Sequence, residues 1–166
     1  MKRFLKSDIE YFEKLSKIMD SDIVIESIKR KGLRTTKTGA SAMVFMSKKY
    51  NYVVKIGDSL DMVPRKSSRF HKYYAKILWR SKNKKIIVQE YVSTRSKDSE
   101  RALKRIAKEC NVDIYDLDET YDIRHHNVGI KNNKPKIIDY RNYSSLKSLE
   151  FATDPYWYGR NIQYFR

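Results

Sequence analysis

The stretch DIRHHNVGIKNNKPKIID, residues 122–139, decides the fold of this chain. A carboxylate at Asp122 precedes an amide at Asn127, and a second carboxylate, Asp139, follows an apolar run directly. Between them, Asn132-Asn133-Lys134-Pro135 is rich in turn-forming residues. The stretch therefore predicts a loop entering a short strand, a tight turn, and a second strand over residues 136–138.

The polar residues of this hairpin suggest a metal-and-phosphate site. Mg²⁺ prefers oxygen ligands and usually takes only a few of them from the protein. Asn127 and Asp139 can supply such a pair if the hairpin brings them together. Asp122 would then lie beside them, where it could orient a hydroxyl group or accept its proton. The alternatives are structural: Asp122 as a loop cap, Asn127 as a turn residue and Asp139 as a strand end.

The rest of the sequence mixes helical and strand-like periods. Ser7, with Glu10 three positions later, predicts the start of a first helix, whose apolar face runs from Ile9 to Met19. Ser21-Asp22 predicts the start of a second helix that ends near Gly32. We expect further helices over 67–80 and 98–110, and strands over 33–38, 42–47, 51–56 and 85–92. This order predicts an α+β fold.

Composition sets limits on the class of protein. A chain of 166 residues that is 40% hydrophobic can form one folded domain. The single cysteine, Cys110, excludes an internal disulfide and argues against a cysteine-based zinc site. No apolar run reaches the roughly 20 residues of a membrane-spanning helix, and the start does not have the pattern of a secretory signal. We therefore expect a cytoplasmic protein with no membrane partner.

The formal net charge of +16 is the strongest compositional feature. Such a balance raises the local concentration of anions, including nucleotides, nucleic acid and acidic protein faces. The basic residues are spread along the whole chain, and an AT-rich genome would also enrich lysine. The charge therefore keeps nucleic acid open as a partner without identifying it.

The spacing Asp122-x-x-x-x-Asn127 followed by Ile-Ile-Asp139 resembles the catalytic loop and metal-binding aspartate of the protein-kinase-like superfamily. The longer stretch is similar to short kinase-like proteins of bacteriophages. Val53-Val54-Lys55 resembles the third-strand lysine motif, and residues 39–44 resemble the glycine-rich loop.

The resemblance implies a role for each matching residue. Lys55 would contact phosphates, Asn127 and Asp139 would hold Mg²⁺, Asp122 would act on the acceptor hydroxyl, and Arg124 would neutralise developing charge. Residues 87–92 resemble the strand that leads into the hinge, where backbone groups would meet the adenine. The implied nucleotide-binding residues are Gly39, Ser41, Val44, Lys55, Glu90 and Val92.

The implied architecture is a single, truncated kinase-like domain over residues 1–166. Its N-lobe, a small antiparallel sheet with a helical extension over 1–31, would reach about residue 92. A reduced helical C-lobe carrying the catalytic-loop hairpin would occupy about 93–166. The sequence departs from the family pattern, because no glutamate lies between Lys55 and Ile86 to pair with the lysine.

The resemblance implies an ATP- and Mg²⁺-dependent phosphotransferase with a nucleotide and a protein acceptor or host partner. The acceptor is not readable from the sequence, and the protein would act in the host cytoplasm if it is phage-encoded. Two alternatives stay open. One is a pseudokinase that only binds, favoured by the missing glutamate, and the other is a basic binder of nucleic acid or of a host protein.

Overall fold

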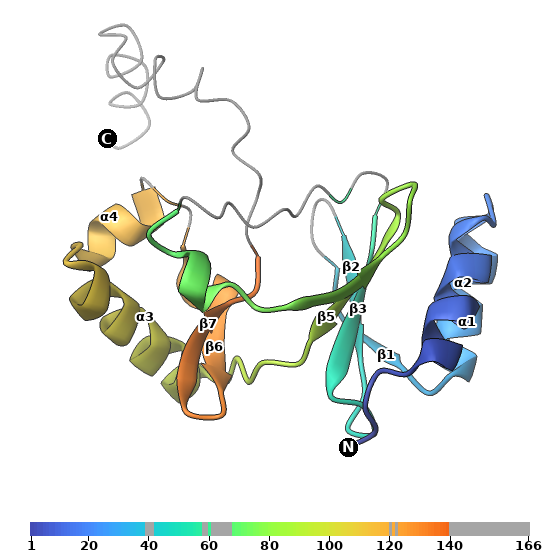
Figure 1. The fold of residues 1–166 in the computed structure, drawn as a ribbon, viewed down its shortest axis with the longest axis horizontal. Helices are drawn as coiled ribbons and strands as arrows, with labels where there is room; N and C mark the ends of the chain where they lie inside the picture. Colours follow the sequence, from blue (N-terminus) through green and yellow to red (C-terminus); the bar gives the residue numbers. More distant parts are fainter. Residues whose placement is uncertain (39–41, 58–59, 61–67, 120, 122, 140–166) are drawn as a thin grey trace, which may run out of the picture.

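The structure is a computed structural model that describes residues 1–38, 42–57, 60, 68–119, 121 and 123–139 of the chain. A five-stranded sheet separates two N-terminal helices on one side from a half that contains a β-hairpin and two further helices (Figure 1). The elements in chain order are α1 (Lys6–Ser16), α2 (Ser21–Arg30), β1 (Arg34–Thr38), β2 (Met43–Met46), β3 (Tyr52–Ile56), the 3₁₀ turn η1 (His71–Tyr73), β4 (Ile77–Arg80), β5 (Ile86–Glu90), α3 (Ser96–Cys110), α4 (Ile114–Glu119), the 3₁₀ turn η2 (His125–Asn127), β6 (Val128–Lys131) and β7 (Lys134–Ile137).

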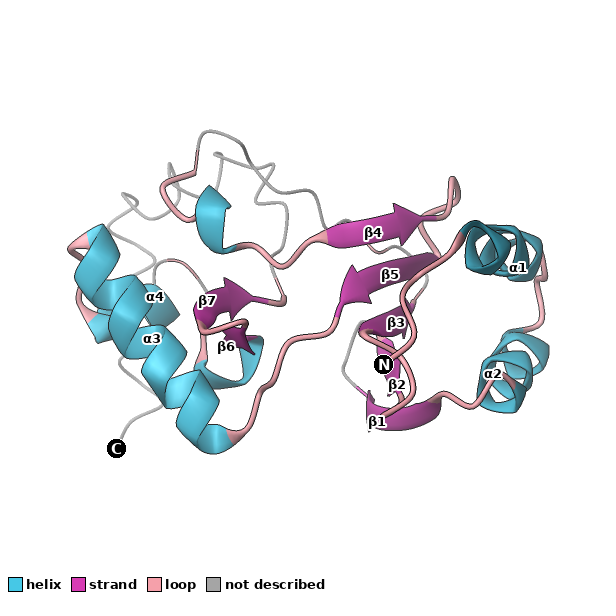
Figure 2. Ribbon diagram, turned by 60° about the horizontal axis from the view of Figure 1, so that its bottom comes forward, coloured by secondary structure: helices cyan, strands magenta, loops and turns pink. Residues whose placement is uncertain are grey.

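The sheet has the strand order β1-β2-β3-β5-β4, and all neighbours are antiparallel (Figure 2). Side chains alternate between its two faces. Val54 and Val88 belong to the core under α1 and α2, whereas Ile87 belongs to the core shared with α3 and the hairpin. Lys55 pairs with Ile87 across β3 and β5 and therefore lies on the face toward α3 and the hairpin.

Both N-terminal helices exist as expected, but the predicted caps were wrong. Helix α1 begins at Lys6, and the side chain of Asp8 reaches back to accept a hydrogen bond from the Leu5 amide at 2.9 Å. Helix α2 is capped by Asp20, whose carboxylate accepts from the Asp22 amide at 2.8 Å. A carboxylate can accept hydrogen bonds from backbone amides as a serine hydroxyl can. At each helix start an aspartate lies next to the serine that was expected to form the cap, and the aspartate forms these contacts.

The apolar face expected for the first helix is only partly buried. Phe12 and Leu15 are buried against the sheet, but Ile9 is 36% exposed and Met19 is 91% exposed. The reason for Met19 is that α1 ends at Ser16, so the helical spacing does not extend to it. Within the described ranges, none of the helices has the length and apolar character needed to span a membrane.

The helix expected over residues 67–80 was wrong. The structure has the short turn η1 followed by strand β4, which pairs with β5 from Ile77↔Gln89 to Arg80↔Ile87. Phe70 and Tyr73 are buried at the turn η1. The cross-strand partner of β4 therefore overrides the local helical period. Helix α4 was not expected.

The remaining elements are confirmed. The three strands β1–β3, strand β5, helix α3 and the hairpin lie within a few residues of their expected bounds. The β6–β7 turn is shorter than predicted, because Asn132 and Asn133 make it with φ angles of 48° and 59°. Asparagine tolerates this left-handed conformation better than most residues, and β7 can therefore begin at Lys134.

Candidate active site

Lys55 is a nearly buried cation on the face of the sheet that looks toward the hairpin. It is 6% exposed, and its ammonium donates a hydrogen bond to the carbonyl of Ile138 at 2.6 Å. Val44 of β2 lies directly opposite it in the sheet. Because a buried charge is costly without polar contacts, the structure holds this ammonium against the hairpin.

The backbone of Ile138 contacts both Lys55 and Asn127. Its amide donates to the carbonyl of Asn127 at 2.8 Å, while its carbonyl accepts from Lys55. Asp139 follows directly and is exposed. The structure therefore brings Lys55, Asn127 and the start of Asp139 together around one residue.

Asn127 is placed by the turn η2 at the entrance of β6. The backbone amide of Asn127 donates to the carbonyl of Arg124 at 2.8 Å, and Asn127 as a whole is 7% exposed. Helix α3 supports this turn, because the Ser99 hydroxyl donates to the Val128 carbonyl at 2.9 Å. The side chain of Arg124 is exposed beside it.

The hairpin that carries the site is hydrogen-bonded along both of its edges. On one edge, Ser93 and Ile130 exchange two backbone hydrogen bonds, of 3.0 and 2.9 Å. On the other edge, the Ala75 amide donates to the Ile137 carbonyl at 2.8 Å. The segments that leave β5 and enter β4 therefore fix the position of the hairpin relative to Lys55.

Gly129 makes the first of these contacts possible. A Cβ atom at this position would lie 2.1 Å from the Ser93 carbonyl oxygen and 2.9 Å from a methyl carbon of Val92. Only glycine allows the two backbones to approach so closely. This role of Gly129 was not predicted, although an isolated glycine inside a strand pattern is a signal of close backbone approach.

Glu90 links the end of β5 to the hairpin through its side chain. Its carboxylate lies 2.8 Å from the ammonium of Lys131 and 3.9 Å from that of Lys136, and it accepts from the Lys76 amide at 2.9 Å. Burial raises the pKa of Glu90, but the hydrogen bonds from Lys131 and Lys76 outweigh it and hold this pKa below its ordinary value.

Glu90 and Val92, the residues whose backbone was expected to contact the adenine, lie where the chain passes from β5 to α3. The backbone amide of Glu90 donates to the Lys76 carbonyl at 2.9 Å, and Val92 is 6% exposed. Of the other expected site residues, Gly39, Ser41 and Asp122 lie outside the described part of the chain.

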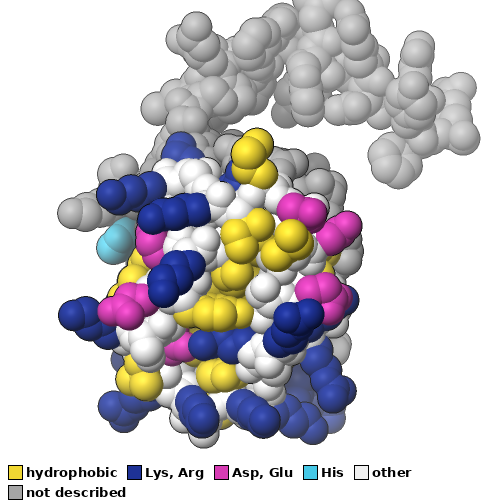
Figure 3. Space-filling view, turned by 90° about the vertical axis from the view of Figure 1, so that its right-hand side faces the viewer, with side chains coloured by type: hydrophobic (Ala, Val, Ile, Leu, Met, Phe, Trp, Pro, Cys, Tyr) yellow, Lys and Arg dark blue, Asp and Glu magenta, His cyan; other side chains and the backbone are white. Residues whose placement is uncertain are grey.

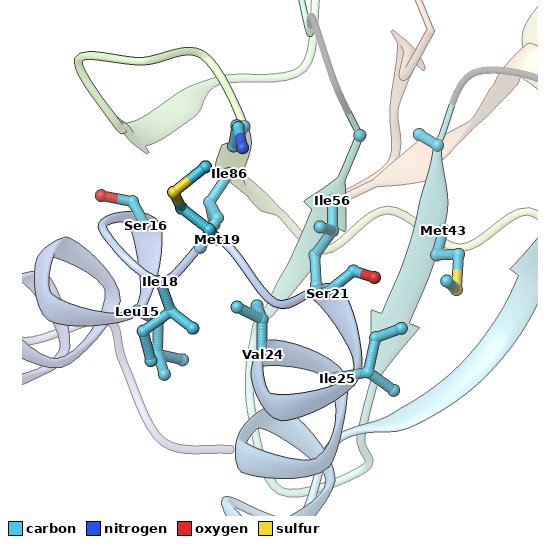
Figure 4. Close-up of a pocket in the computed structure, with 13 residues that line it drawn as sticks. Leu15, Ser16, Ile18, Met19, Ser21, Val24, Ile25, Met43, Ile56 and Ile86 are labelled. Carbon is cyan, nitrogen blue, oxygen red and sulfur yellow. The ribbon is translucent and has the colours of Figure 1, made fainter.

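One mainly apolar hollow lies against the other face of the sheet, away from Lys55. A cavity of about 310 Å³ lies on the opposite face, between the α1–α2 connection and the ends of β2, β3 and β5 (Figure 4). Ile56 and Ile86, which line it, belong to the core cluster under α1 and α2. Its lining is mainly aliphatic and does not include Lys55, Asn127 or Asp139, so it is separate from the candidate site.

Comparison with known proteins gives little further guidance. No family model matches the sequence, and no curated protein matches it. Among solved structures, the chain is similar to APH(2'')-IIa in its ternary complex with streptomycin and ATP. The TM-score is 0.37 at 13% sequence identity, and the match covers 74% of this chain and 70% of that chain. A likeness this slight does not identify a family.

Proposed function

We propose that the protein is an ATP- and Mg²⁺-dependent phosphotransferase of the kinase-like type. One observation carries the proposal: the buried ammonium of Lys55 lies 2.6 Å from the Ile138 carbonyl, one residue before Asp139. The same Ile138 peptide is hydrogen-bonded to Asn127. These two contacts support the proposal, because they bring Lys55 of β3 to the backbone of the hairpin whose two ends are Asn127 and Asp139.

In this proposal, each group acts mainly by positioning and by neutralising charge. The ammonium of Lys55 would exchange the Ile138 carbonyl for phosphate oxygens of the nucleotide. The amide oxygen of Asn127 and the carboxylate of Asp139 are the hard oxygen donors that suit Mg²⁺. A bound Mg²⁺ would offset the negative charge of the phosphates.

The acceptor side of the proposed reaction rests on Asp122 and Arg124. The carboxylate of Asp122 would orient the acceptor hydroxyl and take its proton as the oxygen attacks the γ-phosphorus. The bond from that phosphorus to the β-phosphate bridging oxygen breaks, and ADP leaves. Arg124, exposed beside the turn η2, would stabilise the charge on the transferred group. The class of acceptor stays open.

A second candidate is a binding module that does not transfer phosphate. The observation in its favour is the same contact, because the Lys55 ammonium donates to a carbonyl of the protein itself. The absence of a glutamate between Lys55 and Ile86 in the sequence points the same way. Transfer activity separates the two candidates.

The first experiment measures ATP binding by calorimetry in the presence of Mg²⁺, for wild type and Lys55→Met. We expect the variant to bind at least about tenfold more weakly, which corresponds to roughly 1.4 kcal/mol. Lys97→Met, which changes an exposed lysine on α3, is the matched control and should bind as wild type does. Equal affinity for wild type and Lys55→Met would remove Lys55 from the site.

The second experiment follows the label from γ- and α-labelled ATP with Mg²⁺ or Mn²⁺, using cell-extract acceptors and the protein itself. We expect transfer of the γ-label by wild type and its loss in Asp122→Ala and Asp139→Ala. Movement of the α-label would indicate nucleotidyl transfer. If wild type transfers no more label than the two variants but still binds ATP, the binding-module candidate replaces the enzyme.

A further inference from the structure

The N-terminal segment is tied to the turn between β2 and β3. The amide of Lys2 donates to the Lys49 carbonyl at 2.6 Å, and the Asn51 amide donates to the Lys2 carbonyl at 3.1 Å. Lys2 and Tyr50 form an isolated parallel bridge. Two basic segments that are far apart in sequence therefore lie side by side, at the end of the sheet where Figure 1 marks the N-terminus.

This arrangement creates a group of five exposed cations, which we call the basic cluster. Its members are Lys2, Arg3, Arg34, Lys48 and Lys49. Arg34 joins the group because it pairs with Met46, one residue before the turn. The corresponding lower edge of the molecule is lined with lysine and arginine side chains in Figure 3.

The cations of the basic cluster are not neutralised by direct ion pairs with described residues. None of its members takes part in an ion pair there. Asp8, on the first turn of α1, has one oxygen on Lys31 at 2.7 Å and the other on the Leu5 amide. Because like charges repel, folding gathers these cations at a cost that a polyanion would relieve.

Lys48 and Lys49 of the basic cluster are too far from the proposed active site to act on the same phosphates. The β2–β3 turn ends at Tyr50, and Lys55 lies five residues further along the chain. A strand rises about 3.3 Å per residue, so the end of the turn that carries Lys48 and Lys49 is about 17 Å from Lys55 along the strand. These two lysines therefore serve a different anion from a nucleotide that contacts Lys55.

We propose that the basic cluster binds the phosphate backbone of nucleic acid without reading base sequence. Cations on neighbouring strands suit the closely spaced charges of a nucleic-acid backbone. A flat anionic membrane is disfavoured, because α1 and α2 carry the exposed acidic residues Glu10, Asp22 and Glu26. Figure 3 shows acidic side chains on the face above the lower edge. A rod-shaped duplex can contact the cluster alone.

The test measures binding of a fluorescent DNA duplex of roughly 20 base pairs by anisotropy, between about 50 and 200 mM salt. We expect Lys48→Gln/Lys49→Gln to weaken binding and to reduce the slope of log K against log salt by about two, one for each lost phosphate contact. The control Lys97→Gln/Lys108→Gln removes the same charge from exposed positions on α3 and should leave the slope unchanged.

Three outcomes would overturn the proposal: no binding by wild type, equal loss in both double variants, or binding to anionic phospholipid vesicles in preference to the duplex. Circular dichroism of each variant checks that it is folded. Lys55→Met should bind the duplex as wild type does, so failure of nucleic-acid binding and failure of ATP binding are separate results.

Discussion

Gly129→Ala should be among the most damaging single-methyl changes in this protein. The added Cβ would lie 2.1 Å from the Ser93 carbonyl oxygen and 2.9 Å from the Ser93 carbonyl carbon. Both are backbone atoms and cannot rotate away. The hairpin must therefore move from residues 92–93 by about 1 Å or more to reach an ordinary contact distance.

The cost can be worked from the contacts that this movement breaks. The two backbone hydrogen bonds between Ser93 and Ile130, of 3.0 and 2.9 Å, are worth about 1 kcal/mol each. Overpacking against Val92 adds about 1–3 kcal/mol. The expected loss is about 3–5 kcal/mol, a large part of the stability of an ordinary small domain.

Urea unfolding followed by circular dichroism measures this loss, and Gly32→Ala is the control. Gly32 has a φ of +89°, but no atom lies within 4 Å of the place that an alanine Cβ would occupy, so alanine there meets only backbone strain, of about 1–2 kcal/mol. Gly129→Ala should also weaken ATP binding, because the moved hairpin carries Asn127 and Asp139, the proposed Mg²⁺ ligands, away from Lys55. A Gly129→Ala protein as stable as Gly32→Ala, with unchanged ATP affinity, would refute the reasoning.

Two further predictions concern buried and half-buried charges. Asp8→Ala should cost about 3–5 kcal/mol in urea unfolding, because it leaves the Lys31 ammonium, 19% exposed, without its carboxylate. Glu26→Ala breaks an exposed pair with Lys29 and should cost much less, so equal losses for the two variants would contradict the assignment. The pKa of Glu90 is lowered in the folded state, so its stabilisation is present above the ordinary glutamate pKa of about 4.3 and is lost as pH falls through the folded value. Urea midpoints measured downward from about pH 5 should fall less steeply for Glu90→Gln than for wild type, and parallel curves would argue against the link.

The fold was predictable where the pattern is local. Helix α3 buries Ala102 and Ile106 as its spacing indicated, and the small β-meander follows from short runs of β-branched residues. Strand β4 was not predictable in this way, because Ile77 and its neighbours have helical spacing and become a strand only through pairing with β5. The predicted caps of α1 and α2 were wrong because aspartates next to the expected serines accept hydrogen bonds from the backbone amides at the two helix starts.

The candidate site was likewise predictable only where its residues are close together in the sequence. Asn127 and Asp139 flank one hairpin, so a tight turn between them was enough to suggest that they lie at the same end. The contact between Lys55 and Ile138 joins residues 83 positions apart, and no local period contains it. The ion pairs of Glu90 could not be predicted either, because its partners Lys131 and Lys136 lie about 40 residues further along the chain, in the hairpin.

The long sequence separation of the Lys55–Ile138 contact has a consequence for the order of folding. Contacts between distant residues form late, because a large loop must close before they contribute any stability. The five-stranded sheet lies wholly before residue 91 and can begin to form on a growing chain. The hairpin must then dock between two segments that already exist, at residues 74–75 and 93. A ribosome-bound fragment ending before Ile138 would therefore lack the carbonyl that Lys55 contacts, and the candidate site would come into being only in the last stage of folding.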